Sequence, residues 1–375
     1  MKSLIKLTFF SLILFLTSCS FQTSFFKVIN NEFINKNLII SPLSAYQVLG
    51  LTTNGAKGRT LEEMLLALGN KNLDELNKIN TNILKTVQQF STIEIANAVM
   101  TKFNPNKGFV TSVNKYKATI TTLKGLSQVN KWCSIKTKGK ITKILDKLNP
   151  NTLMILLNAV YFKAEWVNTF TGGKTTKKPF YNLNSESNVV QVDTMSQKSK
   201  FLYNEDNEVQ IIELPYKKDS MSAVIILPKK EININNFISK LNDEKLQKLI
   251  KRMTSNEVEL QLPKFELNYS SSLVNTLKKL GMNIPFGGSA DFSGMRKEND
   301  IYIYEVIQKT YLKVNELGTE AAAVTAVTMV TKSIKPKTPE PKLMIVNRPF
   351  IFLLRNKKLP INNEMLFMAK IENLK

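Results

Sequence analysis

Asn315-Glu316-Leu317-Gly318-Thr319-Glu320-Ala321-Ala322-Ala323-Val324-Thr325-Ala326-Val327-Thr328 is the stretch on which the interpretation of this chain depends. Its alanines favour a helix, whereas the β-branched residues that follow favour a strand. As a strand it would carry small or β-branched side chains at almost every position of one face: Thr319, Ala321, Ala323, Thr325 and Val327, with Met329 at the end. No proline occurs from Gly318 to Ser333, so each residue there could join a strand ladder. An ordinary buried strand or helix would have the same composition.

Length, charge and composition limit the function. The chain has 375 residues, 43 % of them hydrophobic, and a formal net charge of +22. This length allows one large domain or two. The charge favours a polyanion or a membrane surface as a partner, although lysines scattered over solvated faces give the same balance. Histidine is absent, which excludes Ser-His-Asp and Cys-His catalytic sites and histidine-ligated zinc. We expect no metal and no cofactor, and an enzyme is the least favoured function.

Residues 1–18 have the pattern of an export signal. Lys2 and Lys6 precede an apolar run that ends at Leu16 and is too short to span a bilayer comfortably. The following Thr17-Ser18-Cys19 resembles the end of a bacterial lipobox. This resemblance implies cleavage before Cys19, lipid attached to that cysteine, and an exported protein anchored to a membrane at the cell envelope or outside the cell. A plain secretory signal and an uncleaved anchor are the alternatives.

The stretch from Asn315 to Ala323 resembles the hinge of the serpin reactive-centre loop. Other segments resemble the same family in the same order, over nearly the whole chain after residue 33: Leu38-Ile-Ile-Ser41-Pro42-Leu43-Ser44, Asn158-Ala-Val-Tyr-Phe162 with Trp166, and Arg348-Pro349-Phe350 with Met365-Leu-Phe367. The resemblance implies an α+β serpin fold with three β-sheets, the largest being the central sheet A, and about eight or nine helices. It also implies an exposed reactive-centre loop at about residues 316–342, within a single domain over residues 19–375.

The resemblance also assigns roles to particular residues. The hinge comprises Gly318, Thr319, Glu320, Ala321, Ala322 and Ala323. The shutter and breach, which are the middle and top of sheet A, comprise Ser41, Ser44, Asn158, Trp166 and Gln308. Gln308 stands where serpins commonly have histidine, but its amide can still donate and accept hydrogen bonds. Independently of the family, Ser41-Pro42 has the pattern of a helix start, with a capping hydroxyl before a first-turn proline.

Counting along the loop as the family does, the fourteenth residue after Gly318 is Lys332, so the bait bond joins Lys332 to Ser333. The resemblance implies suicide inhibition, in which the cleaved loop enters the main sheet as a strand while the protease stays attached. A lysine at the bait suits trypsin-like serine proteases that prefer Lys or Arg, and a shifted register would suit other serine or cysteine proteases. We expect a monomer. The alternatives are a non-inhibitory serpin that acts as a surface binding module, and a polyanion-binding surface protein.

Overall fold

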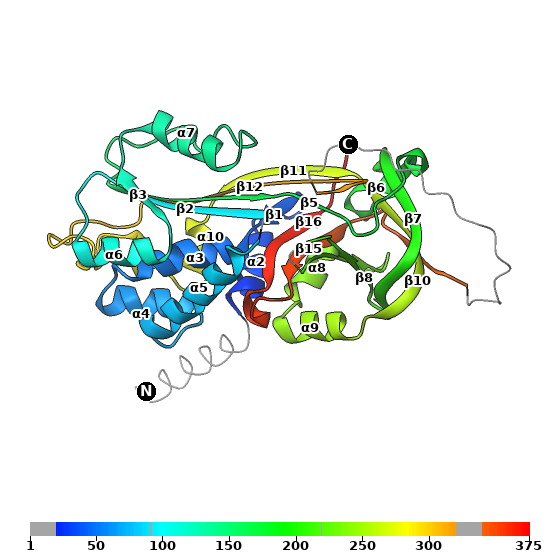
Figure 1. Ribbon diagram of the computed structural model, residues 1–375, viewed down its shortest axis with the longest axis horizontal. Helices are drawn as coiled ribbons and strands as arrows, with labels where there is room; N and C mark the ends of the chain where they lie inside the picture. The colour runs from blue at the N-terminus through cyan, green and yellow to red at the C-terminus, as the bar shows by residue number, and fades with distance from the viewer. Residues whose placement is uncertain (1–19, 91, 219, 320–339) are drawn as a thin grey trace.

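The computed structural model describes residues 20–90, 92–218, 220–319 and 340–375. In this part of the chain, sixteen strands form two β-sheets, and nine α-helices pack around them (Figure 1). No helix in these ranges is both long enough and apolar enough to cross a membrane. The predicted α+β architecture is confirmed.

The central sheet has seven strands in the described residues, and it carries the resembling segments. Its order is β3 (Thr119–Thr122), β2 (Ile93–Thr101), β4 (Met154–Phe162), β12 (Glu305–Asn315), β13 (Gly318–Thr319) and β5 (Ala164–Glu165), with β11 (Phe265–Ser272) paired to β12. β4 and β12 are parallel, from Ile155 beside Glu305 to Val160 beside Thr310. Every residue of β4 is buried, because both faces of the sheet are covered.

The second sheet joins two of the three sheets that the resemblance implied. It comprises β1 (Leu38–Ile40), β16 (Met365–Ile371), β15 (Phe350–Asn356), β9 (Met221–Pro228), β8 (Val209–Pro215), β7 (Val189–Glu205), β10 (Thr254–Pro263), β14 (Lys342–Ile345) and β6 (Thr176–Tyr181). The 17-residue β7 pairs with β6, β10 and β8 at different points along its length. Hydrogen bonding is therefore continuous through β7, and the smaller sheets are connected rather than separate.

Helices cover both faces of the central sheet. On one side lies α3 (Pro42–Thr53), a helix in which every residue is buried. On the other side lies α7 (Leu126–Lys136), above the sheet in Figure 1. The remaining helices are α4 (Gly58–Ala67), α5 (Leu73–Val87), α6 (Lys107–Lys115), α8 (Ile234–Ser239), α9 (Asp243–Lys251) and α10 (Val274–Lys279). The central strands are thus held between α3 and α7.

The packing of α7 explains its unpaired cysteine. Val129, Trp132 and Cys133 form one apolar cluster with Leu157 of β4 and Ile307 of β12. Cys133 is fully buried, and desolvation raises the pKa of its thiol to about 12. It is therefore a small core residue and not a reactive thiol.

The residues before β1 form a ten-residue helix. Helix α2 runs over Phe21–Asn30, and Phe21, Phe25, Phe26 and Ile29 on it are buried. Their spacing of three or four residues places them on one helical face. Helix α2 is therefore part of the core.

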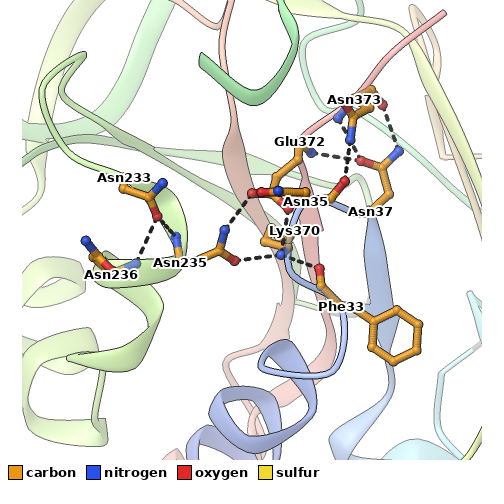
Figure 2. Close-up of polar contacts among 9 residues, drawn as sticks. All are labelled: Phe33, Asn35, Asn37, Asn233, Asn235, Asn236, Lys370, Glu372 and Asn373. Atoms are coloured by element: carbon orange, nitrogen blue, oxygen red, sulfur yellow. Dashed lines mark hydrogen bonds and ion pairs between the residues drawn. The ribbon is translucent and has the colours of Figure 1, made fainter. Parts of the chain in front are cut away.

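Asn37 fixes the connection from α2 to β1 against the carboxyl end of the chain (Figure 2). Its side-chain oxygen accepts the backbone N–H groups of Glu372 and Asn373, at 2.8 and 2.9 Å. Its amide donates to the carbonyl of Asn373 at 2.7 Å. These bonds tie the first described segment to the last.

Below this tie a lysine is buried with its counter-ion. Lys370 Nζ lies 2.7 Å from Glu372 Oε2, and these side chains are 0 % and 2 % exposed. The ammonium also donates to the Phe33 carbonyl at 2.8 Å and to Asn235 Oδ1 at 2.7 Å, contacts that Figure 2 shows converging. Desolvation lowers the pKa of Lys370, whereas its hydrogen bond to Glu372 opposes that shift.

Replacing Lys370 by Met should destabilise the fold by about 3–5 kcal/mol, because it leaves the Glu372 carboxylate buried without its partner. Urea unfolding followed by circular dichroism measures the change. The matched control is Lys230→Met, which removes an exposed lysine paired with Glu186 and should leave the midpoint nearly unchanged. Equal effects of the two substitutions would contradict the role given to Lys370.

Candidate functional site

The shutter residues come together as one buried hydrogen-bond cluster. Gln308 Oε1 accepts the Ser41 amide at 2.8 Å, and Gln308 Nε2 donates to the Ser41 carbonyl at 2.9 Å and to Asn158 Oδ1 at 3.0 Å. Ser44 Oγ donates to Asn158 Oδ1 at 2.5 Å. All four residues are at most 1 % exposed. Glutamine therefore joins α3 to both central strands, β4 and β12.

Two details of this cluster differ from the sequence prediction. Ser41 precedes α3 as expected, but its hydroxyl makes no capping hydrogen bond and is buried without a partner in the described structure. The backbone of Ser41 makes the contacts instead. Sequence reasoning also missed Asn97 of β2, whose Oδ1 accepts from Asn158 Nδ2 at 2.7 Å. The one feature that could have identified Asn97 is the strand register, because Asn97 lies directly beside Asn158 on the neighbouring strand.

Trp166, which the resemblance assigns to the breach, follows β5 directly and is 1 % exposed. Its indole stacks on Tyr216, with ring centroids 4.2 Å apart and an interplanar angle of 18°. The indole N–H donates to the Asn315 carbonyl at 3.0 Å. Tyr216 was not predicted as a site residue, yet its hydroxyl lies 2.8 Å from Thr319 Oγ1. Complete burial raises the pKa of Tyr216 far above its usual range, so the phenol stays neutral.

The first two hinge residues already lie in the central sheet. Gly318 and Thr319 form β13, which pairs with Asn315 and Val314 of β12 on one side and with β5 on the other. Thr319 is fully buried. We expected this residue to be the start of the inserting segment, held outside the sheet. The structure instead has Thr319 already paired within the sheet.

Gly318 is required at this point by both backbone and space. Its φ of +154° lies in the region that L side chains rarely adopt, and an added Cβ would lie 2.0 Å from the Ala164 carbonyl oxygen. Asn315 Oδ1 accepts the N–H groups of Leu317 and Gly318, at 3.0 and 3.2 Å, and so closes the turn. No larger residue could follow this turn into the sheet.

Glu316 anchors the turn from outside the sheet. Its carboxylate accepts from Thr175 Oγ1 at 2.8 Å and pairs with Lys264 Nζ at 3.1 Å. Desolvation would raise the pKa of Glu316, but its backbone hydrogen bond, Thr175 and Lys264 together hold that pKa below the usual value. The contribution of Glu316 to stability is therefore present above its unfolded pKa and is lost as the pH falls through the lower folded pKa.

Several predicted site residues lie outside the described residues. They are Cys19 of the lipobox, Glu320, Ala321, Ala322 and Ala323 of the hinge, and Lys332 and Ser333 of the bait bond. The described flanks of the loop end at Thr319 and resume at Glu340.

Gln308→Met should lower the free energy of unfolding by about 1–3 kcal/mol, because it keeps the side-chain volume but leaves the buried Ser41 N–H without an acceptor. Urea denaturation measures this loss. Gln191→Met, at an exposed position of β7, is the control and should change little. A Gln308→Met protein as stable as its parent would show that the cluster does not hold the sheet together.

Comparison with known proteins assigns the family. The model of the family described as "Serpin (serine protease inhibitor)" matches residues 17–374. "Intracellular coagulation inhibitor 2" of Tachypleus tridentatus is 32 % identical, covering 90 % of this chain and 86 % of its own. A "Leukocyte elastase inhibitor" of Xenopus laevis is 33 % identical, covering 88 % and 92 %.

A solved structure agrees with these sequence relatives. The native state of the thermophilic serpin Tengpin superposes with a TM-score of 0.85 at 33 % identity, covering 96 % of this chain and 94 % of that one. The match includes the sheet and the helices described above. This chain belongs to the serpin family.

Proposed function

We propose that this protein inhibits serine proteases by offering Lys332–Ser333 as bait and then drawing the cleaved loop into the central sheet. Protease inhibition in general is supported by its relatives, which are named as inhibitors. The observation that carries the insertion mechanism is β13, the two-residue strand that already lies between β12 and β5.

The register of β13 extends along both neighbouring strands without a shift. Thr319 lies beside Val314 on one side and Ala164 on the other. Continuing residue by residue, Thr325 would reach Gln308 and Asn158, and Thr328 would reach Glu305 and Ile155. These are the residues that β12 and β4 now pair with one another. A strand can therefore enter when β4 and β12 separate sideways, with no sliding along their length.

This register matches small side chains to the buried face. Thr319 points into the core beside Tyr216, so Ala321, Ala323, Thr325 and Val327 would follow on that face. Thr325 would separate Gln308 from Asn158, whose hydrogen bond is now 3.0 Å long. Its hydroxyl can both donate and accept, so it can replace the bond that its arrival breaks.

The opposite face offers a partner for the one charged residue of the segment. Glu320 would lie between Lys313 of β12 and Lys163, which follows β4, and both lysines are exposed. Lys313 now pairs with Glu266 at 3.1 Å. A carboxylate between two ammonium groups is favourable even in solvent, although each exposed pair contributes little alone.

The energy gain favours a one-way step. Residues 320–328 would add roughly 30 Å of strand at about 3.3 Å per residue. About ten new ladder hydrogen bonds at a net 0.5–1.5 kcal/mol each supply on the order of 5–15 kcal/mol. A protease still attached at Lys332 would be carried along the inhibitor, and its catalytic geometry would be distorted.

Lys332 favours a trypsin-like target, because a specificity pocket with a buried carboxylate needs a cationic partner. Incubation with trypsin should give a complex of summed mass that survives a denaturing gel. Mass spectrometry should place the cut between Lys332 and Ser333. Lys332→Ala should lose trypsin inhibition, whereas Lys337→Ala, beyond the bond, should keep it. Cleavage without a trapped complex would favour the non-inhibitory alternative.

Thr325→Arg should convert inhibitor into substrate, because a guanidinium would have to enter the buried shutter cluster. We expect the fraction of trapped trypsin to fall about tenfold or more while cleavage at Lys332 continues. The nicked mutant should also lack the rise in melting temperature that insertion gives the nicked parent. Thr319 is a poorer site for this test, since it is buried before cleavage. An undiminished complex would rule out this register.

We also propose that the mature protein begins at a lipid-modified Cys19 and is held at a membrane. The support is the short apolar run and the Thr17-Ser18-Cys19 ending. More than one acyl chain on a single cysteine satisfies the requirement for stable anchoring.

A further inference from the structure

In the proposed mature chain, one peptide unit separates the anchored Cys19 from the folded domain. Ser20, the first described residue, precedes α2 directly. Its backbone N–H donates to Asp243 Oδ2, and its hydroxyl donates to Asp243 Oδ1 at 2.7 Å. Cys19 is therefore one peptide unit, about 3.8 Å, from a residue bound to the first turn of α9.

Helix α9 lies along the outside of the domain next to this point. Leu246 and Leu249 are buried, whereas Lys248 and Lys251 are exposed, as is Arg252, which follows the helix. In Figure 1, α9 runs along the lower edge, and β12, β5 and α7 lie on the upper side. Its nine residues extend about 13 Å from Asp243 at 1.5 Å per residue. The whole exposed face thus stays close to the anchoring point.

The charges of this face are predominantly positive after internal pairing. A hollow of about 350 Å³ on it is lined by Lys240, Lys245, Lys248, Arg252, Asp206, Glu208 and Glu244, among others. Glu208 pairs with Lys245 at 2.5 Å, and Asp206 accepts the N–H groups of Glu208 and Val209.

Within the described part of the chain, no ion pair is found for the other cations of this face: Lys240, Lys248, Lys251 and Arg252. Two carboxylates of the hollow, those of Asp206 and Glu244, likewise make no ion pair there, so four cations face two anions. The face therefore keeps an excess of positive charge.

We infer that the exposed face of α9, defined by Lys240, Lys248, Lys251 and Arg252, rests on the anionic phospholipid headgroups of the membrane that holds Cys19. This inference rests on the proposed lipid anchor. The near end of the face lies within about one Debye length, roughly 10 Å, of Cys19, and the far end lies about 13 Å farther along α9, so its cations stay near the headgroups. The upper layer with β5 and β12 then faces away from the bilayer, toward approaching proteases.

The test uses the full chain, lipidated in a lipoprotein-exporting bacterium and placed in vesicles that contain anionic phosphatidylglycerol. A fluorescent label is attached to Glu244→Cys on α9 or, as the matched control, to Ile135→Cys on α7. Both positions are exposed, and the native Cys133 is buried. Spin labels attached to the lipid headgroups should quench the fluorescence of the label at position 244 at a rate at least about fivefold higher than that of the label at position 135.

A charge-reversal pair identifies the cause. Lys248→Glu, Lys251→Glu and Arg252→Glu together should abolish most of this difference. The control makes the same change of charge at or near α7, with Lys124→Glu, Lys131→Glu and Lys136→Glu. It should leave the difference in quenching unchanged. Lipid on Cys19 with equal quenching at both labels overturns the orientation and leaves the anchor intact. Absence of lipid from Cys19 overturns both.

Discussion

The hydrogen bond between Gln308 and Asn158 is the constraint on which the rest of the structure depends. It joins β12 to β4 in the middle of the central sheet, and through Ser41 and Ser44 it joins both strands to α3. Beyond the pairing of these two strands, β13 lies between β12 and β5, the short strand that follows β4. The sheet is closed in its middle and opened at its top by two residues of its own chain. In the proposed mechanism, the inserted loop would satisfy the same polar groups in a second arrangement of the sheet.

Much of this organisation could be predicted from the sequence, because it is encoded in local patterns. The apolar run of β4, the Gly318 turn and the shutter residues all stand in recognisable stretches. What could not be predicted depends on contacts between distant residues. The hydroxyl of Tyr216 that holds Thr319 comes from a segment about a hundred positions away. The burial of helix α2 depends on such contacts too, because its apolar face is stabilised by packing against other elements rather than by helix propensity. The prediction that the Ser41 hydroxyl caps the helix was wrong for a related reason. The backbone of the buried serine, and not its side chain, contacts Gln308.

The fold shows where the charged side chains of this basic chain lie. Many lysines are paired on the surface, such as Lys217 with Glu165 and Lys230 with Glu186, and these contribute little. The ion pair of Lys370 with Glu372 is different, because it lies in the interior and joins the carboxyl-terminal strand to the loop before β1. Net charge alone therefore predicted neither the buried pair nor the cationic edge along α9. Both become visible only when the positions of the side chains in the fold are known.

The position of α7 has a consequence for timing. Its apolar side contacts Leu157 of β4 and Ile307 of β12 in one cluster, so the helix bridges the boundary between these strands. Adding a strand there moves them apart by one further interstrand spacing, about 4.8 Å. The helix cannot keep both sets of contacts across that wider gap, and it must shift or lift before the sheet can widen. In the proposed mechanism, the packing of Val129, Trp132 and Cys133 would therefore slow strand insertion, and its strength would set whether a captured protease is released before it is displaced.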